Sequence, residues 1–186
     1  MKLKSLALAS LALITAAAAS AATPSPSPGA SSKGSKTTAN AGDQTQQIDS
    51  YVREIEGKTS SYTRKEEMLA ADKLKKVTDE NWSKIHTYSE GKALKRMKLY
   101  PAAGSQKTEE FYYKNDKPVF VFLEANGAGK ENHDANAKGE KYYFANGKLV
   151  AAMSADGSAM DINSADAKKT AAKLMKEAQA FRAAAK

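Results

Sequence analysis

The sequence predicts an α+β fold: an antiparallel β-meander of about six strands, with N-terminal helices and one C-terminal helix packed on it. Two stretches, EFYYKNDKPVFVF at 110–122 and EKYYFANGKLVAA at 140–152, repeat one pattern of aromatic strand, tight turn, lysine and aliphatic strand. A fainter copy, YSEGKAL, lies at 88–94. Helical periodicity before and after these repeats places helices at both ends of the sheet.

The N-terminal part of the chain is expected to lie outside the fold. Residues 1–21 begin with two lysines and continue with a Leu/Ala-rich run and small residues, which is typical of a secretory signal peptide. A membrane anchor is disfavoured, because this apolar run is Ala-rich and short and no other stretch approaches the ~20 apolar residues of a spanning helix. Residues 22–47, rich in Pro, Ser, Thr and Gly, predict a disordered linker. Residues 48–186 are then one α+β domain.

Two helices are expected at the start of this domain. Four apolar residues between 48 and 55 recur at i, i+3, i+4 and i+7, which predicts a helix that ends at Gly57. Residues 64–78 predict a second helix with a basic side, although its amphipathic pattern is less regular. The residues just before it, 60–63, are compatible with an extended conformation.

The sheet follows in order along the chain. We expect strands from 83 to a turn at Glu90-Gly91, and then at 93–100, 108–114, 117–124, 140–145 and 148–153. Asn146-Gly147 between two apolar runs is a strong hairpin signal, since both central residues of such a turn take positive φ. A last helix is expected over 164–186, capped by Asn163 or Ser164.

The Y-x-x-G-K hairpins between a short helix and a closing basic helix resemble a group of uncharacterised bacterial exported proteins and lipoproteins with repeated YYF-x-x-G-K-L hairpins. They are also distantly similar to MORN-like repeats. The likeness covers about 83–153, but the chain lacks the Gly-rich spacing and strand tryptophan of MORN repeats. What the resemblance implies is a fold and an exported compartment, with no activity attached.

Composition narrows the possible chemistry. The chain has no cysteine, which excludes disulfides, thiol catalysis and lipid attachment at a cysteine. The only histidines, His86 and His133, are interpreted as surface or rim residues, and no G-x-S-x-G motif is present. Adjacent acids such as Glu109-Glu110 are interpreted as solvated charge. The loop from 134 starts like a calcium loop but lacks its later oxygen ligands. We therefore expect no enzymatic activity, no catalytic residue, no metal and no cofactor.

The best binding candidates are cations and aromatics on neighbouring hairpins. The net charge is +8, so a basic exported protein is drawn to anionic surfaces. The candidate binding residues are Lys92, Lys95, Arg96, Lys98, Tyr112 and Tyr143. Arg96 and Lys98 are expected to share one strand face, with Lys95 on the other. Edge lysines that prevent aggregation, and tyrosines that form cross-strand core pairs, are the structural alternatives.

These observations predict an exported interaction module, periplasmic or secreted, without enzymatic activity. Its expected partner is an unknown protein or an anionic envelope polymer bound at the sheet face, not a specific nucleic acid, and no transmembrane segment is expected after signal cleavage. The alternative is a hydrolase with an unrecognised carboxylate/His site, which would need a cleft joining His86 with two carboxylates. A housekeeping protein with weak anion affinity is a third possibility.

Overall fold

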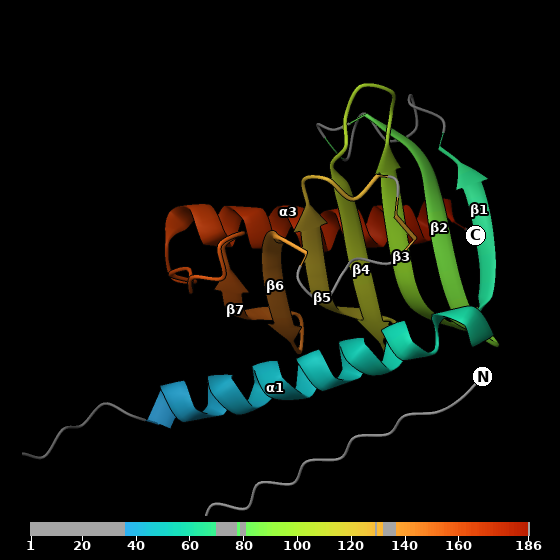
Figure 1. The fold of residues 1–186 in the computed structure, drawn as a ribbon. Helices are drawn as coiled ribbons and strands as arrows, with labels where there is room; N and C mark the ends of the chain where they lie inside the picture. Colours follow the sequence, from blue (N-terminus) through green and yellow to red (C-terminus); the bar gives the residue numbers. More distant parts are fainter. Residues whose placement is uncertain (1–35, 70–77, 79–80, 129, 132–136, 186) are drawn as a thin grey trace, which may run out of the picture. The chain divides into compact units, whose positions relative to one another are not determined.

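The computed structural model describes residues 36–69, 78, 81–128, 130–131 and 137–185. Within them the chain forms one antiparallel sheet with a helix on each face, so the α+β prediction is confirmed (Figure 1). The predicted signal peptide, residues 1–21, lies outside the described residues.

The sheet has seven strands rather than six, and their spatial order is their order in the chain. They are β1 (Thr63–Met68), β2 (Trp82–Glu90), β3 (Ala93–Pro101), β4 (Thr108–Lys114), β5 (Lys117–Glu124), β6 (Gly139–Ala145) and β7 (Lys148–Met153). Every neighbouring pair is antiparallel, which makes the sheet a continuous meander. Strands that follow one another in the sequence usually pair in space, which favours this order.

The additional strand is β1, in the segment where the sequence predicts a helix. The helix prediction over 64–78 is wrong for its first part, and residues 70–77 lie outside the described part of the chain. β1 pairs with β2 along its whole length, from Thr63 opposite Ser89 to Met68 opposite Lys84. Its sequence, TRKEEM, is largely exposed and charged, as is common in strands at the edge of a sheet. Pairing with β2, rather than an apolar pattern of its own, makes it a strand.

Helix α1 (Lys36–Gly57) and helix α3 (Ala165–Ala184) flank the sheet, and a short 3₁₀ turn, η1 (Thr59–Ser61), follows α1. α1 begins inside the segment 22–47, so the last part of the predicted linker is helical. α3 begins as expected, with the Ser164 hydroxyl accepting a hydrogen bond from the Ala167 N–H at 3.2 Å.

The three repeated phrases are β-hairpins with two-residue turns, at Gly91-Lys92, Asn115-Asp116 and Asn146-Gly147. In the last two turns both central residues have positive φ, between 51° and 77°, which is the geometry of a type I′ turn. When the three hairpins are aligned by their turns, the residue after the turn is Ala93 in the first hairpin and Lys117 and Lys148 in the other two. Lys92 is therefore a turn residue and does not correspond to these lysines.

Each hairpin also contains a β-bulge at the same place. In the first, Tyr88 lies opposite Arg96 while Ser89 lies opposite Leu94, which leaves one residue of β3 without a partner. The extra residues are Lys95, Val119 and Val150. A bulge adds one residue to one strand and so changes which of its side chains share a face with the partner strand. The first hairpin therefore places Arg96, not Lys95, on the face of Tyr88.

The two faces of the sheet are covered differently. α3 packs on one face through Ala171, Leu174, Ala178 and Phe181, over a large apolar cluster that includes Ile85, Met97, Leu99, Phe111, Val121 and Phe144. α1 packs on the opposite face through Val52 and Ile55, over Tyr112, Phe120, Phe122 and Tyr143. We call these the α3 face and the α1 face.

Candidate functional site

The six predicted binding residues do not form one surface. Four of them are at most 1% exposed: Arg96, Lys98, Tyr112 and Tyr143. Lys92 is exposed and Lys95 is half-buried. The expectation of an exposed arm is therefore wrong for Arg96 and Lys98, because both side chains lie on the α1 face and meet buried carboxylates there. They do share a face, as predicted.

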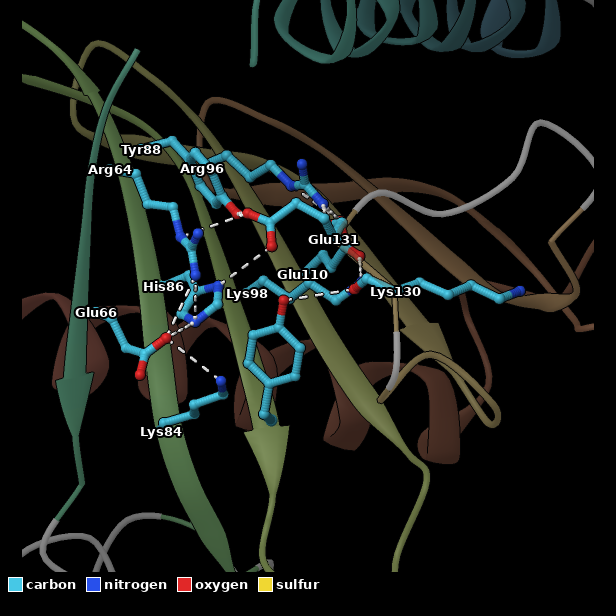
Figure 2. A network of polar contacts seen from close by, with 11 residues as sticks. Arg64, Glu66, Lys84, His86, Tyr88, Arg96, Lys98, Glu110, Lys130 and Glu131 are labelled. Atoms are coloured by element: carbon cyan, nitrogen blue, oxygen red, sulfur yellow. Dashed lines mark hydrogen bonds and ion pairs between the residues drawn. The ribbon is translucent and has the colours of Figure 1, made fainter. Parts of the chain in front are cut away.

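Glu110 of β4 is the centre of this buried ionic cluster (Figure 2). Its Oε1 lies 2.7 Å from Lys98 Nζ, and its Oε2 accepts hydrogen bonds from Arg96 Nη2 at 2.7 Å and Nε at 3.0 Å. All three side chains are fully buried. A carboxylate that binds two cations stabilises both where water cannot solvate them.

Strand register brings these residues together. Lys98 of β3 lies directly opposite Glu110 of β4 and also opposite His86 of β2. Arg96 lies opposite Tyr112 on one side and Tyr88 on the other. Because residues two apart on a strand share a face, the pairs fall in two adjacent rows on the α1 face.

Two tyrosines enclose the Arg96 guanidinium, which lies 5.1 Å from the centre of the Tyr88 ring and 5.8 Å from that of Tyr112. The Tyr112 hydroxyl lies between two carboxylates and shares its one proton between Glu110, at 2.9 Å, and Glu56 of α1. Burial opposes the charge of Arg96, but Tyr112, Glu110 and Glu56 outweigh it and raise its pKa. Burial also raises the pKa of Tyr112, so the phenol keeps its proton and remains a donor.

His86 lies at the outer side of the cluster and is 2% exposed, so its interpretation as a surface or rim residue is wrong. Its Nε2 is 2.6 Å from Glu66 of β1, and its ring contacts Tyr100 with centroids 4.5 Å apart. Burial lowers the pKa of His86, and the hydrogen bond to Glu66 opposes this only in part. The imidazole is then neutral near pH 7. Its Nε2 faces both the Glu66 carboxylate, which can only accept, and Arg64 Nη2 at 3.1 Å, which can only donate.

Residues 130–131, which lie between β5 and β6, cover the cluster. Arg96 Nη2 donates to the backbone oxygen of Glu131 at 2.8 Å, and Tyr100 donates to that of Lys130 at 3.4 Å. The Glu131 carboxylate accepts a hydrogen bond from the Tyr88 hydroxyl and lies 3.5 Å from Arg64. These contacts hold residues 130–131 on the sheet, so the cluster is enclosed.

This arrangement tests two interpretations made from the sequence: that adjacent acids are solvated charge, and that a hydrolase would need a cleft joining His86 with two carboxylates. Glu109 and Glu110 are both buried, so their interpretation as solvated charge is wrong. His86 does lie near two carboxylates, at 2.6 Å from Glu66 and, through Nδ1, 3.8 Å from Glu131. Its ring is nearly inaccessible, however, and the hollows described next are lined by other side chains. His133 and the calcium-like start of the loop lie outside the described residues.

The three hairpin turns lie at the same end of the sheet (Figure 1), and exposed lysines lie within or next to each of them in the sequence. We call this surface the turn edge and define it by Lys92, Lys114, Lys117 and Lys148. Each is exposed, and none forms an ion pair with any described residue. Two further cations near the turns are compensated: Lys95 is 2.9 Å from Glu90, and Arg182 of α3 is 2.7 Å from Asp116.

Two hollows open on the turn edge. One, of about 440 Å³, is lined by Tyr51, Lys92, Lys95 and Lys114, among others. The second, of about 420 Å³, lies between α1 and the second and third turns, and it shares Tyr51 and Lys114 with the first. Tyr51 is held in place because its hydroxyl donates a hydrogen bond to the backbone carbonyl oxygen of Tyr113 at 2.6 Å. Lys114 Nζ lies 5.3 Å from the centre of its ring.

No protein-family model, curated protein or solved structure matches this chain. Among the described residues, no three His, Cys, Asp or Glu side chains are placed to hold a metal ion. Neither helix in the described part of the chain combines the length and apolar content needed to cross a membrane.

Proposed function

We propose that this protein is an exported, non-enzymatic binding module that attaches to an anionic component of the bacterial envelope through the turn edge. The observation that carries the proposal is the set of four exposed lysines around the hairpin turns, none of which has an ionic partner among the described residues. The sequence features of a signal peptide support export. The net charge supports an anionic partner: it is +8 for the whole chain and +6 once residues 1–21, with Lys2 and Lys4, are removed.

The turn edge supports this function better than the sheet face does. Both faces carry helices and buried side chains, so the sheet offers no broad open surface to a polymer. At the turn edge the lysines come from consecutive hairpins, and adjacent turns are separated by two strand spacings, or roughly 10 Å. A linear or planar anionic surface can therefore contact several lysines at once.

Retention of the exported protein on anionic liposomes and on acidic polysaccharide beads, measured from 0.1 to 1 M salt, tests the proposal. Binding led by exposed charges should weaken steeply, since the Debye length falls from about 10 Å to about 3 Å over this range. The triple variant Lys92→Glu, Lys114→Glu, Lys117→Glu should lose retention at 0.1 M salt. Arg96 and Lys98 are unsuitable for this test, because reversing buried charges would disturb the fold.

The matched control carries the same charge change on α3, as Lys168→Glu, Lys169→Glu and Lys176→Glu, which are also exposed. It should retain most of the binding. Equal loss in both variants would mean that net charge alone governs retention, and no loss in the first would refute a role for the turn edge.

A hydrolase is the alternative, and the carboxylates on both sides of His86 favour it. It would require the segment at 130–131 to move away so that a substrate can reach the imidazole. Hydrolysis of ester, glycoside or phosphate substrates by the wild type, abolished in His86→Asn with the fold intact, would favour this alternative over a binding module.

A further inference from the structure

We infer that the hollow between α1 and the second and third hairpin turns is a binding subsite for an acidic oligosaccharide. This inference rests on the proposed function and specifies its ligand. We call the hollow the α1 groove; its polar lining includes Gln44, Gln47, Tyr51, Lys114, Lys117 and Asn146. Its volume of about 420 Å³ lies within the range of small-molecule sites.

The amide side chains are the first reason for a sugar. Gln44 and Gln47 are three residues apart on α1 and so lie on the same side of the helix. Asn115 and Asn146 line the groove from two turns of the sheet. Each carboxamide offers donors and an acceptor, which matches sugar hydroxyls, since a hydroxyl also donates and accepts. A site for a simple anion would need donors only.

The floor of the groove is the second reason. Ile48 of α1 and Pro118 and Val119 of β5 contribute apolar surface to the lining. Sugar rings have apolar C–H faces between their hydroxyls, so a mixed polar and aliphatic lining suits them. Ligand sites in general combine an apolar wall with a few placed polar groups.

Two properties of the lining distinguish an acidic sugar from a nucleic acid: its lysines, and the absence of an open aromatic ring among the residues that line it. Lys114 and Lys117 make no ion pair with described residues, so they can bind carboxylate groups on the sugar. Binding of single-stranded nucleic acid uses exposed aromatic rings on which bases stack. In this groove Phe144 is only 1% exposed, and Tyr51 is half-buried with Lys114 beside its ring. The lining therefore favours an acidic sugar over a nucleic acid.

Calorimetric titration of the exported protein with defined probes tests the inference. The acidic probes are trimers of galacturonate and tetramers of alternating glucuronate and N-acetylglucosamine; the neutral probe is maltotriose and the simple anion is inorganic phosphate. At least one acidic probe should bind saturably, at least tenfold more tightly than maltotriose or phosphate. Gln44→Ala with Gln47→Ala should weaken that binding at least tenfold, while salt-dependent retention on liposomes stays unchanged.

The matched control is Gln106→Ala with Gln179→Ala, two exposed glutamines outside the groove, which should bind as the wild type does. The inference is overturned if neither acidic probe binds, if phosphate binds as tightly as they do, or if the Gln44/Gln47 variant binds normally. Any of these results leaves the turn-edge proposal standing, provided that the lysine reversals still abolish retention. Loss of sugar binding together with normal retention in the lysine variant would instead refute the turn-edge proposal alone.

Discussion

The two faces of this sheet are buried by different means. On the α3 face, aliphatic and aromatic side chains of the strands meet the narrow apolar stripe of α3. On the α1 face, the strands β5 to β7 are covered in the same way by α1, but β2 to β4 carry Arg96, Lys98 and Glu110 under residues 130–131. The first arrangement needs only volume and shape to match. The second needs every charge to be paired, so its stability depends on a complete set of partners.

Removing one partner from the ionic cluster should have the largest effect. Glu110→Ala leaves two buried cations next to each other without their shared carboxylate. Loss of one member of a buried ion pair costs roughly 3–5 kcal/mol of unfolding free energy. Urea unfolding followed by circular dichroism measures this directly, and a cost below about 1 kcal/mol would mean that water or another carboxylate replaces Glu110.

The control for that variant replaces the whole set, as Arg96→Met, Lys98→Met and Glu110→Leu. With all three fully buried charges removed, and Glu56 still partly open to solvent, unfolding free energy should return to the wild-type value or exceed it. A triple variant as unstable as Glu110→Ala would show that packing, rather than charge pairing, governs this part of the α1 face.

The α3 face should respond more gradually. Leu174 is 2% exposed and packs from α3 onto the sheet, so Leu174→Ala removes buried apolar volume and leaves a cavity. The expected loss is about 2–4 kcal/mol of unfolding free energy, without a dependence on salt. Ala172→Gly, at an exposed position of the same helix, should cost only about 1 kcal/mol. Because Leu174→Ala does not lower helix propensity, a loss no larger than that of Ala172→Gly would mean that the core closes around the missing side chain.

A variant in a hairpin turn changes neither packed face, so it shows how much unfolding free energy depends on the backbone of a turn alone. Gly147 has φ of 77° and open space around its Cα, so a side chain there meets a conformational penalty and no collision. Gly147→Val should lower unfolding free energy by on the order of 1 kcal/mol or more, because a β-branched residue resists positive φ. Asn146→Gly, which keeps the turn geometry accessible, is the control, and its melting temperature should differ little from that of the wild type.

The smallest expected effect is a dependence of unfolding free energy on pH, caused by His86 on the α1 face. Because burial holds the folded pKa of His86 below its ordinary value of about 6.5, the unfolded chain takes up this proton first. Stability is therefore lost as pH falls from about 6.5 through the folded pKa, by up to about 1.4 kcal/mol for each unit of lowering. Chemical unfolding between pH 7 and 5 should show this slope in the wild type and in His133→Asn. It should be reduced in His86→Asn.

Local signals in the sequence were enough to predict the hairpins, but not the cluster. Asn146-Gly147 and the alternating strands around it fix a turn and a register within a few residues. β1 could not be found in this way, since TRKEEM becomes a strand only by pairing with β2. The prediction that Arg96 and Lys98 form an exposed arm is wrong because their partners lie on other segments: Glu110 on β4, Glu56 on α1 and the backbone oxygen of Glu131. Two cations at alternate positions of a central strand, next to a strand with Glu110, were the available signal.

The bulge that recurs in the three hairpins gives each of them one residue that strand pairing does not use. In the first hairpin Leu94 lies opposite Ser89 and Arg96 lies opposite Tyr88, so Lys95 between them has no partner. If Lys95 were deleted, both of these pairs could remain, and Arg96 and Lys98 would stay on the α1 face with only the bulge lost. Loss of a second residue between the turn and Arg96 would shift the register by one position and turn Arg96 and Lys98 toward the apolar cluster under α3. The spare residue therefore makes each hairpin tolerant of a single deletion that a regular hairpin could not absorb.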